Sequence, residues 1–229
     1  MSDKKSTVVV AGAAGRLGKH VVNELLKRNY KVKAMIVPPF DSPDTPELLA
    51  DGIEIAEGSL ESVDKIKEVL KGADYLISAI GSTKPFSNKT FEKIDVQGNF
   101  NLAIAAKELG IKNFIVISSI GAGDSRDALS TMFKLMMWTV LKKKTEMEGI
   151  IKNSGVIYTI IRPGGYTEKP ASDEIAIGEG GKISGLIRRD QVAKFCVDAI
   201  EKETMKNRTF EIVDSTKMNQ ESKEDLIEI

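Results

Sequence analysis

Short apolar runs alternate with longer amphipathic segments along most of the chain. The runs that predict strands are Thr7–Ala11, Tyr30–Val37, Ile53–Ala56, Tyr75–Ile80, Phe114–Ile117, Val156–Ile161 and Thr209–Val213. Several are continuous rather than alternating, as expected for strands buried on both faces of a sheet. Apolar residues recur at helical spacing in Arg16–Arg28, Glu61–Lys71, Phe91–Leu109, Leu129–Asn153 and Val192–Ile200. This alternation predicts βαβ units in a single Rossmann-type, doubly wound parallel sheet of the α/β class.

The length of 229 residues suits one domain. We expect residues 1–213 to form it, with a small C-terminal substrate-side region supplied mainly by residues 163–190. A glycine-rich segment, Gly178–Gly185, lies inside that region. The polar tail, residues 214–229, is expected to fray.

Composition excludes several classes of protein. Apolar residues make up 41% of the chain, and 33 basic residues balance 33 acidic ones, so the net charge does not favour a general nucleic-acid binder. The near-apolar run Met132–Leu141 is interrupted by Lys134 and is shorter than the roughly 20 residues of a membrane span. One cysteine, Cys196, and one histidine, His20, exclude an internal disulfide and a multi-histidine metal site. With no secretory segment at Met1–Thr7, we expect a cytoplasmic protein without a metal.

The first predicted strand is followed directly by a glycine-rich loop that opens the first predicted helix. Its sequence, Gly12-Ala13-Ala14-Gly15-Arg16-Leu17-Gly18, has the spacing GxxGxxG. The first glycine permits a tight turn, the second a close approach of backbone amides to a diphosphate, and the third close packing of helix on strand. The free amides and the helix dipole favour an anion there. We therefore expect Gly12, Ala14, Gly15, Arg16, Leu17 and Gly18 to bind a dinucleotide.

The end of the second strand usually selects between NAD and NADP. An acid there binds the ribose 2′-hydroxyl, whereas a nearby arginine accommodates a 2′-phosphate. Here the segment begins with Val37 and two prolines, without an acid, and Arg16 in the glycine loop could contact the phosphate. A solvated Arg16 is the equally weighted alternative. NADP(H) is favoured modestly over NAD(H).

At this point the chain resembles a known family, the atypical short-chain dehydrogenase/reductases of the NmrA-like and biliverdin-IXβ-reductase-like group. The resemblance extends from Val8 to Val213. After the glycine loop, its landmarks are Glu57-Gly58-Ser59-Leu60, Ile80-Gly81, Asp95-Val96-Gln97-Gly98-Asn99, Val116-Ile117-Ser118-Ser119, Lys144-Thr145-Glu146 and Tyr158-Thr159-Ile160-Ile161-Arg162-Pro163-Gly164-Gly165.

The resemblance implies cofactor contacts after three further strands. Ser59 and Leu60 would flank the adenine, with Ser59 in place of the usual aspartate. Ser78, Ala79, Ile80 and Gly81 would follow the ribose and diphosphate, and Pro163, Gly164 and Gly165 would lie against the nicotinamide carboxamide. All these segments follow predicted parallel strands, where ligands bind in such sheets.

The usual proton donor of the superfamily is missing. Its members use a serine, a tyrosine and a lysine, and the tyrosine stands four residues before the lysine on one helix face. Ser119 and Lys144 match the serine and the lysine, but Val140 stands where the tyrosine is expected. Lys144 would hold the nicotinamide ribose, or would be one more solvated residue of a lysine run. Tyr166 is an alternative donor, with a packing role favoured over it.

The segment Met132–Trp138 is apolar around its circumference. We favour burial in the core with a subunit contact, which would make the helix at 129–153 a homodimer interface. A substrate entrance lined by methionines and a membrane-surface contact are the alternatives.

Two hypotheses for the function follow. The first is an NAD(P)(H)-dependent oxidoreductase that transfers hydride between NADP(H) and a small organic substrate without the usual tyrosine. The second is a non-catalytic NAD(P)-binding redox sensor or assembly protein of the NmrA-like kind. Epimerase chemistry is disfavoured, because about fifty residues after Pro163 leave little room for a sugar-nucleotide domain.

Overall fold

The computed structural model describes residues 6–36, 53–81, 91–170, 172–219 and 226–229. Their centre is an eight-stranded sheet with the order β3-β2-β1-β4-β5-β6-β10-β8. Seven neighbouring strands are parallel: β1 Thr7–Ala11, β2 Lys31–Ile36, β3 Ile53–Glu57, β4 Tyr75–Ser78, β5 Phe114–Ile117, β6 Tyr158–Pro163 and β10 Arg208–Asp214. The last strand of the sheet, β8 Ile175–Gly178, is antiparallel to β10. The order reverses between β1 and β4, which is the arrangement predicted from the sequence.

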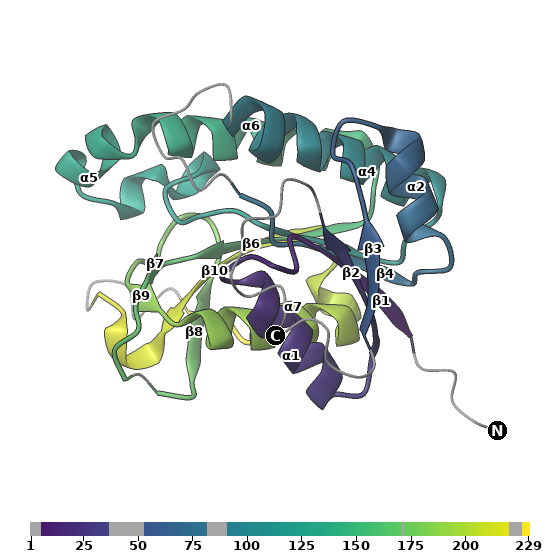
Figure 1. Ribbon diagram of the computed structural model, residues 1–229. Coiled ribbons are helices and arrows are strands. Elements are labelled where there is room, and N and C mark those ends of the chain that lie inside the picture. Colours follow the sequence, from purple (N-terminus) through teal and green to yellow (C-terminus); the bar gives the residue numbers. More distant parts are fainter. Residues whose placement is uncertain (1–5, 37–52, 82–90, 171, 220–225) are drawn as a thin grey trace.

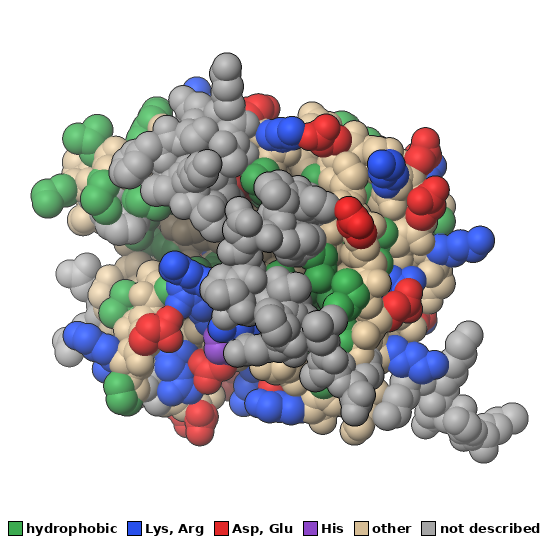
Figure 2. All heavy atoms as spheres, in the orientation of Figure 1, with side chains coloured by type: hydrophobic (Ala, Val, Ile, Leu, Met, Phe, Trp, Pro, Cys, Tyr) green, Lys and Arg blue, Asp and Glu red, His purple; other side chains and the backbone are tan. Residues whose placement is uncertain are grey.

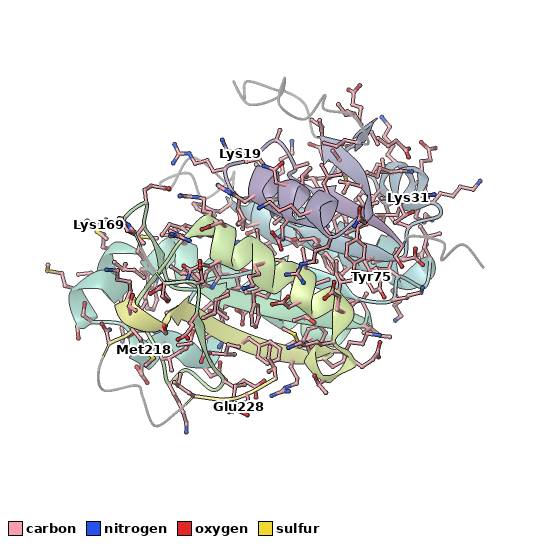
Figure 3. The ribbon with its side chains drawn as sticks, turned by 90° about the horizontal axis from the view of Figure 1, so that it is seen from below. Lys19, Lys31, Tyr75, Lys169, Met218 and Glu228 are labelled. Carbon is pink, nitrogen blue, oxygen red and sulfur yellow. The ribbon has the colours of Figure 1, made fainter. Side chains whose placement is uncertain are left out.

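Helices cover both faces of the sheet (Figure 1). On one face, α1 Gly18–Lys27 and α7 Arg189–Glu201 lie side by side, as Figure 3 shows from below. The other face carries α2 Val63–Leu70, α4 Asn99–Glu108 and α6 Trp138–Ser154. Alternate strand residues enter the two resulting cores, as Val8 and Val10 do on the α1 side and Val9 and Ala11 on the other. The doubly wound α/β prediction is confirmed.

Two predicted helices differ in detail from the observed ones. The stretch expected at Phe91–Leu109 begins as a π-helix, η2 Glu92–Gly98, and continues as α4. The stretch expected at Leu129–Asn153 is divided at Met137 into α5 Thr131–Met136 and α6. Short 3₁₀ turns are η3 Gly123–Ala128, η4 Glu203–Met205 and η5 Ser215–Lys217. Two-residue strands β7 Gly165–Tyr166 and β9 Leu186–Ile187 form a second, parallel sheet that the sequence pattern did not predict.

The described part of the C-terminal tail is held against the domain, so the expected fraying is wrong for these residues. The amide of Asn219 donates to the carbonyl of Ser184 at 2.9 Å, and the amide of Ile227 donates to the carbonyl of Ile177 at 2.9 Å. Backbone pairing with the domain, together with packing of Met218, Ile227 and Ile229 against its cores, retains this segment.

The short helix α5 projects from the body of the domain (Figure 1), and Figure 2 shows hydrophobic side chains gathered there. Met132, Leu135 and Met136 are 79%, 78% and 66% exposed. The expectation that this segment is buried in the core is therefore wrong, because the break at Met137 turns α5 away from the sheet. In the described part of the chain, no helix is both long and apolar enough to cross a membrane.

Candidate functional site

The glycine loop lies where β1 ends, against the chain that leaves β4. Gly12 has a φ of +80°, and a Cβ built on it would stand 3.0 Å from the backbone of Ala79 and Ile80. A Cβ on Gly18 would stand 2.0 Å from the carbonyl oxygen of Gly12 and 2.8 Å from the Cα of Ala13. Helix α1 thus begins in direct contact with the loop, at a distance that only glycine permits. The tight turn and the close packing predicted for the loop are both present.

The amino end of α1 has the chemistry of an anion site. No side chain caps it, and the preceding residue, Leu17, contributes no side-chain hydrogen bond. The amide of Gly15 donates to the carbonyl of Gly12 at 2.9 Å, which folds the loop over the start of the helix. Ala14 and Leu17 are buried, so their contacts with a cofactor would come from the backbone, whereas Arg16 is exposed. Uncapped amides at a helix start fit a diphosphate.

The other segments expected to bind the cofactor are placed differently from one another. The amide of Ala79 donates to the carbonyl of Ala11, which brings the segment Ser78–Gly81 beside the glycine loop. The Ser78 side chain is buried and donates to Asn99 Oδ1 at 2.6 Å, so this hydroxyl faces α4.

Ser59 is half-buried and accepts a hydrogen bond from the amide of Glu61 at 3.3 Å. Leu60 is buried, and its carbonyl accepts from Asn101 Nδ2 at 2.7 Å. Val37 lies outside the described residues. Leu60 is thus held by burial and by its carbonyl, whereas Ser59 stays partly accessible at this edge of the sheet.

Lys144 is buried at the end of β5 and forms an ion pair that the sequence analysis did not predict. Its Nζ lies 2.8 Å from Asp95 Oδ1 and donates to the carbonyl of Ile117 at 3.1 Å. Its neighbours Lys142 and Lys143 are exposed and half-buried. The solvated-run interpretation is therefore wrong for Lys144. Because an ammonium group has three donors, one remains beyond these two contacts.

Asp95 joins this pair to the loop after β4. The residue is fully buried in η2, and a Cβ on Gly81 would stand 3.7 Å from its Oδ1. Asn99 Nδ2 donates to the carbonyl of Asp95 at 2.8 Å, within the motif Asp95–Asn99 quoted above as a family landmark. The motif signalled the position, but a carboxylate in an amphipathic helical pattern does not by itself indicate burial beside a lysine.

The side chains predicted to be catalytic do not include a strong proton donor. Ser119 Oγ donates to the carbonyl of Ile120 at 3.0 Å. Val140, where the tyrosine is expected, is half-buried. Tyr166 is 41% exposed, and the Arg189 guanidinium lies 4.4 Å from the centre of its ring. Despite this exposure, loss of solvent by burial raises the pKa of Tyr166 above its ordinary value. Its phenol is thus a weaker acid than that of free tyrosine.

Pro163 ends β6, and Gly164 and Gly165 follow it at the same edge of the sheet. The carbonyl of Pro163 accepts a hydrogen bond from the amide of Ile120 at 3.1 Å, which joins this segment to the loop after β5. The amide of Gly165 donates to the carbonyl of Gly185 at 3.0 Å, so the second, small sheet continues from here. The wall expected beside the nicotinamide is therefore fixed from two sides.

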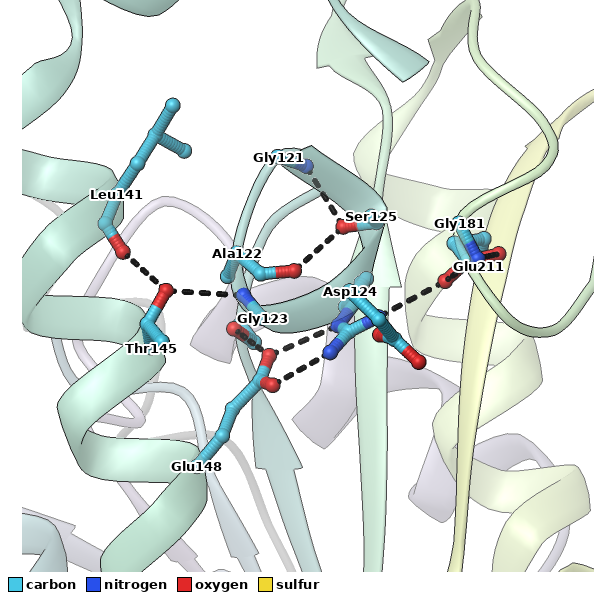
Figure 4. A network of polar contacts seen from close by, with 12 residues as sticks. Gly121, Ala122, Gly123, Asp124, Ser125, Leu141, Thr145, Glu148, Gly181 and Glu211 are labelled. Carbon is cyan, nitrogen blue, oxygen red and sulfur yellow. Dashed lines mark hydrogen bonds and ion pairs between the residues drawn. The ribbon is translucent and has the colours of Figure 1, made fainter. Parts of the chain in front are cut away.

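A buried ionic network is centred on Arg162, the residue before Pro163 in β6, and Figure 4 shows its surroundings. Arg162, 1% exposed, donates through Nε to Glu148 Oε1 at 2.9 Å, through Nη2 to Glu148 Oε2 at 2.6 Å, and through Nη1 to Glu211 Oε1 at 2.9 Å. It also contacts Asp124, and Ser118 Oγ donates to Glu148 Oε1 at 2.5 Å. Figure 4 shows Glu148 and Glu211 on opposite sides of the network. Helix α6, β6 and β10 are thereby held together at the residue that precedes Pro163.

The charges of this network shift the pKa values of its members. Burial lowers the pKa of the Arg162 guanidinium, but hydrogen bonds and charge from Glu148 and Asp124 outweigh burial and leave that pKa above its ordinary value. Burial raises the pKa of Glu211, and its contacts with Arg162 and the amide of Gly181 offset only part of the rise. Arg162 thus stays charged, and Glu211 depends on it for ionisation.

Comparison with known proteins agrees with this geometry. An uncharacterised chloroplast protein of Arabidopsis thaliana is 32% identical over 233 residues, which cover 97% of this chain and 82% of that protein. Sanguinarine reductase of Eschscholzia californica is 27% identical over 254 residues, covering 92% of this chain and 90% of the enzyme. The crystal structure of an anaerobilin reductase from Escherichia coli O157:H7 shares the fold, with a TM-score of 0.77 at 20% identity and coverage of 92% and 98%.

A family model described as NAD(P)H-binding matches residues 12–203 and therefore includes the glycine loop, the Lys144–Asp95 pair and the segment after β6. The resemblance stated from the sequence is confirmed. The chain belongs to the NAD(P)H-binding family.

Proposed function

We propose that the protein is an oxidoreductase that uses NADP(H) to reduce a small organic acceptor. The observation that supports this proposal is the convergence of three features at one edge of the sheet: the glycine loop, the buried Lys144–Asp95 pair and the segment Pro163–Gly165. The likeness to sanguinarine reductase over most of both chains favours a reductase. When bound, the nicotinamide supplies the hydride.

Different segments at this edge would bind different parts of the cofactor. The amides at the start of α1 would bind the diphosphate, and the backbone of Ser78–Gly81 would follow it past the ribose. The third donor of Lys144 would bind the nicotinamide ribose, since Asp95 and the carbonyl of Ile117 fix the other two. Ser59 and Leu60 would flank the adenine. The Arg162 network keeps Pro163–Gly165 in place against the ring.

Preference for NADP(H) rests on Arg16. It is exposed in the glycine loop, and no carboxylate of the described residues pairs with it, so its guanidinium is available to a 2′-phosphate. Glu57, exposed and in register with Ile36 at the end of β2, is the opposing influence because its charge would repel that phosphate. Arg16→Ala should weaken NADPH binding at least tenfold and leave NADH binding unchanged, whereas Glu57→Gln should strengthen NADPH binding. Fluorescence titration of both cofactors measures this.

We propose that solvent supplies the proton. Val140 has no acid, Ser119 Oγ is bonded to the neighbouring carbonyl, and the pKa of Tyr166 is raised. Of the three catalytic candidates, Lys144 acts by positioning the cofactor and Ser119 by a hydrogen bond to the acceptor. The test is oxidation of NADPH by a panel of quinone and flavin acceptors. Ser119→Ala should lower kcat with little change in cofactor affinity. If no acceptor is reduced by a protein that binds NADPH tightly, the oxidoreductase proposal fails.

A non-catalytic sensor is the second candidate, favoured by the same absence of a tyrosine at position 140 and by the exposed apolar face of α5. A sensor would bind cofactor, turn over no acceptor and bind a protein partner differently with NADP+ and NADPH. Binding to a partner that is insensitive to the cofactor would exclude it.

We propose that the outer face of α5 forms a contact between two copies of the chain. We also propose that the protein is located in the cytoplasm. Three large apolar side chains more than 60% exposed on a six-residue helix favour a covering partner. Light scattering should give a dimer that Leu135→Glu converts to a monomer, and fractionation of cells tests the location. A monomeric wild-type protein at high concentration would contradict the contact.

A further inference from the structure

A small pocket opens on α6 beside the loop that follows β5. It has a volume of about 250 Å³ and is lined by Gly121 in that loop, Arg126 in η3, Lys134 in α5, and Trp138, Leu141 and Lys142 in α6. Thr145 completes the wall. The volume is below that of a pocket for a drug-sized ligand. One or two fused rings would fill it.

Every charged side chain that lines this pocket is basic. The Arg126 guanidinium lies 4.3 Å from the centre of the Trp138 ring, so the ring holds it in place. Lys134 is paired with Asp127 at 2.9 Å, and that carboxylate is 96% exposed. Among the residues that the structure describes, no carboxylate pairs with Arg126 or Lys142. The pocket therefore carries about two uncompensated positive charges and favours an anion.

The remaining lining is apolar or has its hydrogen-bonding groups satisfied. Trp138 and Leu141 present ring and methyl surface. The Thr145 hydroxyl accepts from the amide of Gly123 at 2.9 Å and donates to the carbonyl of Leu141 at 2.8 Å, as Figure 4 shows. An inorganic anion would leave this apolar wall uncovered, whereas a flat ring that bears one acidic group would use both parts.

The pocket and the proposed active site are built from two shared elements, the loop after β5 and helix α6. Gly121 follows Ser119 by two residues, and Thr145 follows Lys144 on α6. We propose that this pocket binds the anionic end of a planar aromatic acceptor, with Arg126 and Lys142 binding its carboxylate or sulfonate. The role as an acceptor subsite rests on the proposed oxidoreductase function, whereas binding of the anion does not.

Trp138 is the only tryptophan of the chain, so its fluorescence reports on the pocket directly. Naphthalene-2-sulfonate should change the Trp138 emission saturably and should bind at least tenfold more tightly than the neutral 2-naphthalenemethanol. Arg126→Ala and Lys142→Ala should each weaken sulfonate binding about tenfold, in proportion to the loss of one of two cations. Lys152→Ala, an exposed lysine elsewhere on α6, is the matched control and should change nothing. Equal affinity for the neutral ligand, or an equal effect of the control, would overturn the proposal.

Kinetics test the acceptor role separately. NADPH would reduce 1,4-naphthoquinone or its 2-sulfonate to the hydroquinone by transfer of a hydride and uptake of one solvent proton. Lys142→Ala should raise KM for the sulfonated quinone about tenfold, leave its kcat unchanged and leave both constants for the neutral quinone unchanged. If the sulfonate binds at Trp138 and both quinones respond alike to the substitution, the acceptor role is refuted. If the sulfonate binds and neither quinone is reduced, the oxidoreductase proposal fails and with it the acceptor role.

Discussion

Replacement of Arg162 by leucine should destabilise the protein strongly and in a pH-dependent way. Arg162 is the shared partner of two carboxylates, Glu148 and Glu211, which are 2% and 0% exposed. Removing one partner of a buried ion pair costs about 3–5 kcal/mol, because the remaining charge is left without water or a counter-charge. For a chain of this length, each kcal/mol lowers Tm by about 2–4 °C. Arg162→Leu should therefore lower Tm by about 6–20 °C near neutral pH.

The pH dependence follows from Glu211. Its pKa is already raised in the folded protein, so the folded state binds protons more readily than the unfolded state. Without Arg162 the pKa rises further, and the variant is penalised most where the carboxyl would otherwise ionise. The loss of stability should thus be larger at pH 8 than at pH 5. Urea denaturation followed by circular dichroism, with the exposed Arg16→Leu as control, measures both values. A loss below about 1 kcal/mol, or an equal loss at both pH values, would refute this account of the network.

Substitutions at Gly18, Lys144 and Tyr166 test the proposed site, with Gly149→Ala as a control outside it. Gly18→Ala should abolish NADPH binding because its Cβ would meet the Gly12 carbonyl, and retained binding would contradict the close packing. Gly149→Ala is the control: its Cβ would meet nothing within 4 Å, so this variant should stabilise helix α6 by about 0.5–1 kcal/mol. Lys144→Met should lower the free energy of unfolding by about 3 kcal/mol, because it leaves the Asp95 carboxylate buried without the ammonium group. The double variant Lys144→Met, Asp95→Asn should recover the Tm of the wild type but not its affinity for NADPH. Recovery of affinity in the double variant would exclude ribose binding by Lys144. Tyr166→Phe should change kcat less than about threefold across pH 6–9, since a general acid contributes about a hundredfold or more; a hundredfold loss would identify Tyr166 as the donor.

Buried, continuous strands were the part of the fold that the sequence could predict. A continuous β-branched run such as Thr7–Ala11 is typical of a strand covered on both faces in a parallel sheet. The glycine loop after it identifies this strand as the one that leads into the dinucleotide-binding turn. The short strands β7 and β9 could not be predicted, because two residues carry no periodicity. The break at Met137 was missed because α5 and α6 share one apolar pattern across it.

Buried charges were harder to predict than the glycines of the loop. The spacing of Gly12, Gly15 and Gly18 states a backbone requirement that remains local to the loop. Arg162, Asp95 and Glu148 depend instead on partners that lie 14 to 49 residues away in the chain, and each resembles a surface residue in isolation. Only the three-dimensional arrangement distinguishes Lys144 from its neighbours in the lysine run.

The attachment of the C-terminal residues to β8 protects the last strand of the sheet. An exposed strand edge offers unpaired amides and carbonyls to another chain and promotes edge-to-edge aggregation. Here Leu226 bridges to Gly178 and the Ile227 amide bonds to Ile177, so the final residues occupy that edge themselves. Removing residues 226–229 would uncover the edge. Aggregation on loss of this pairing would report the state of this edge.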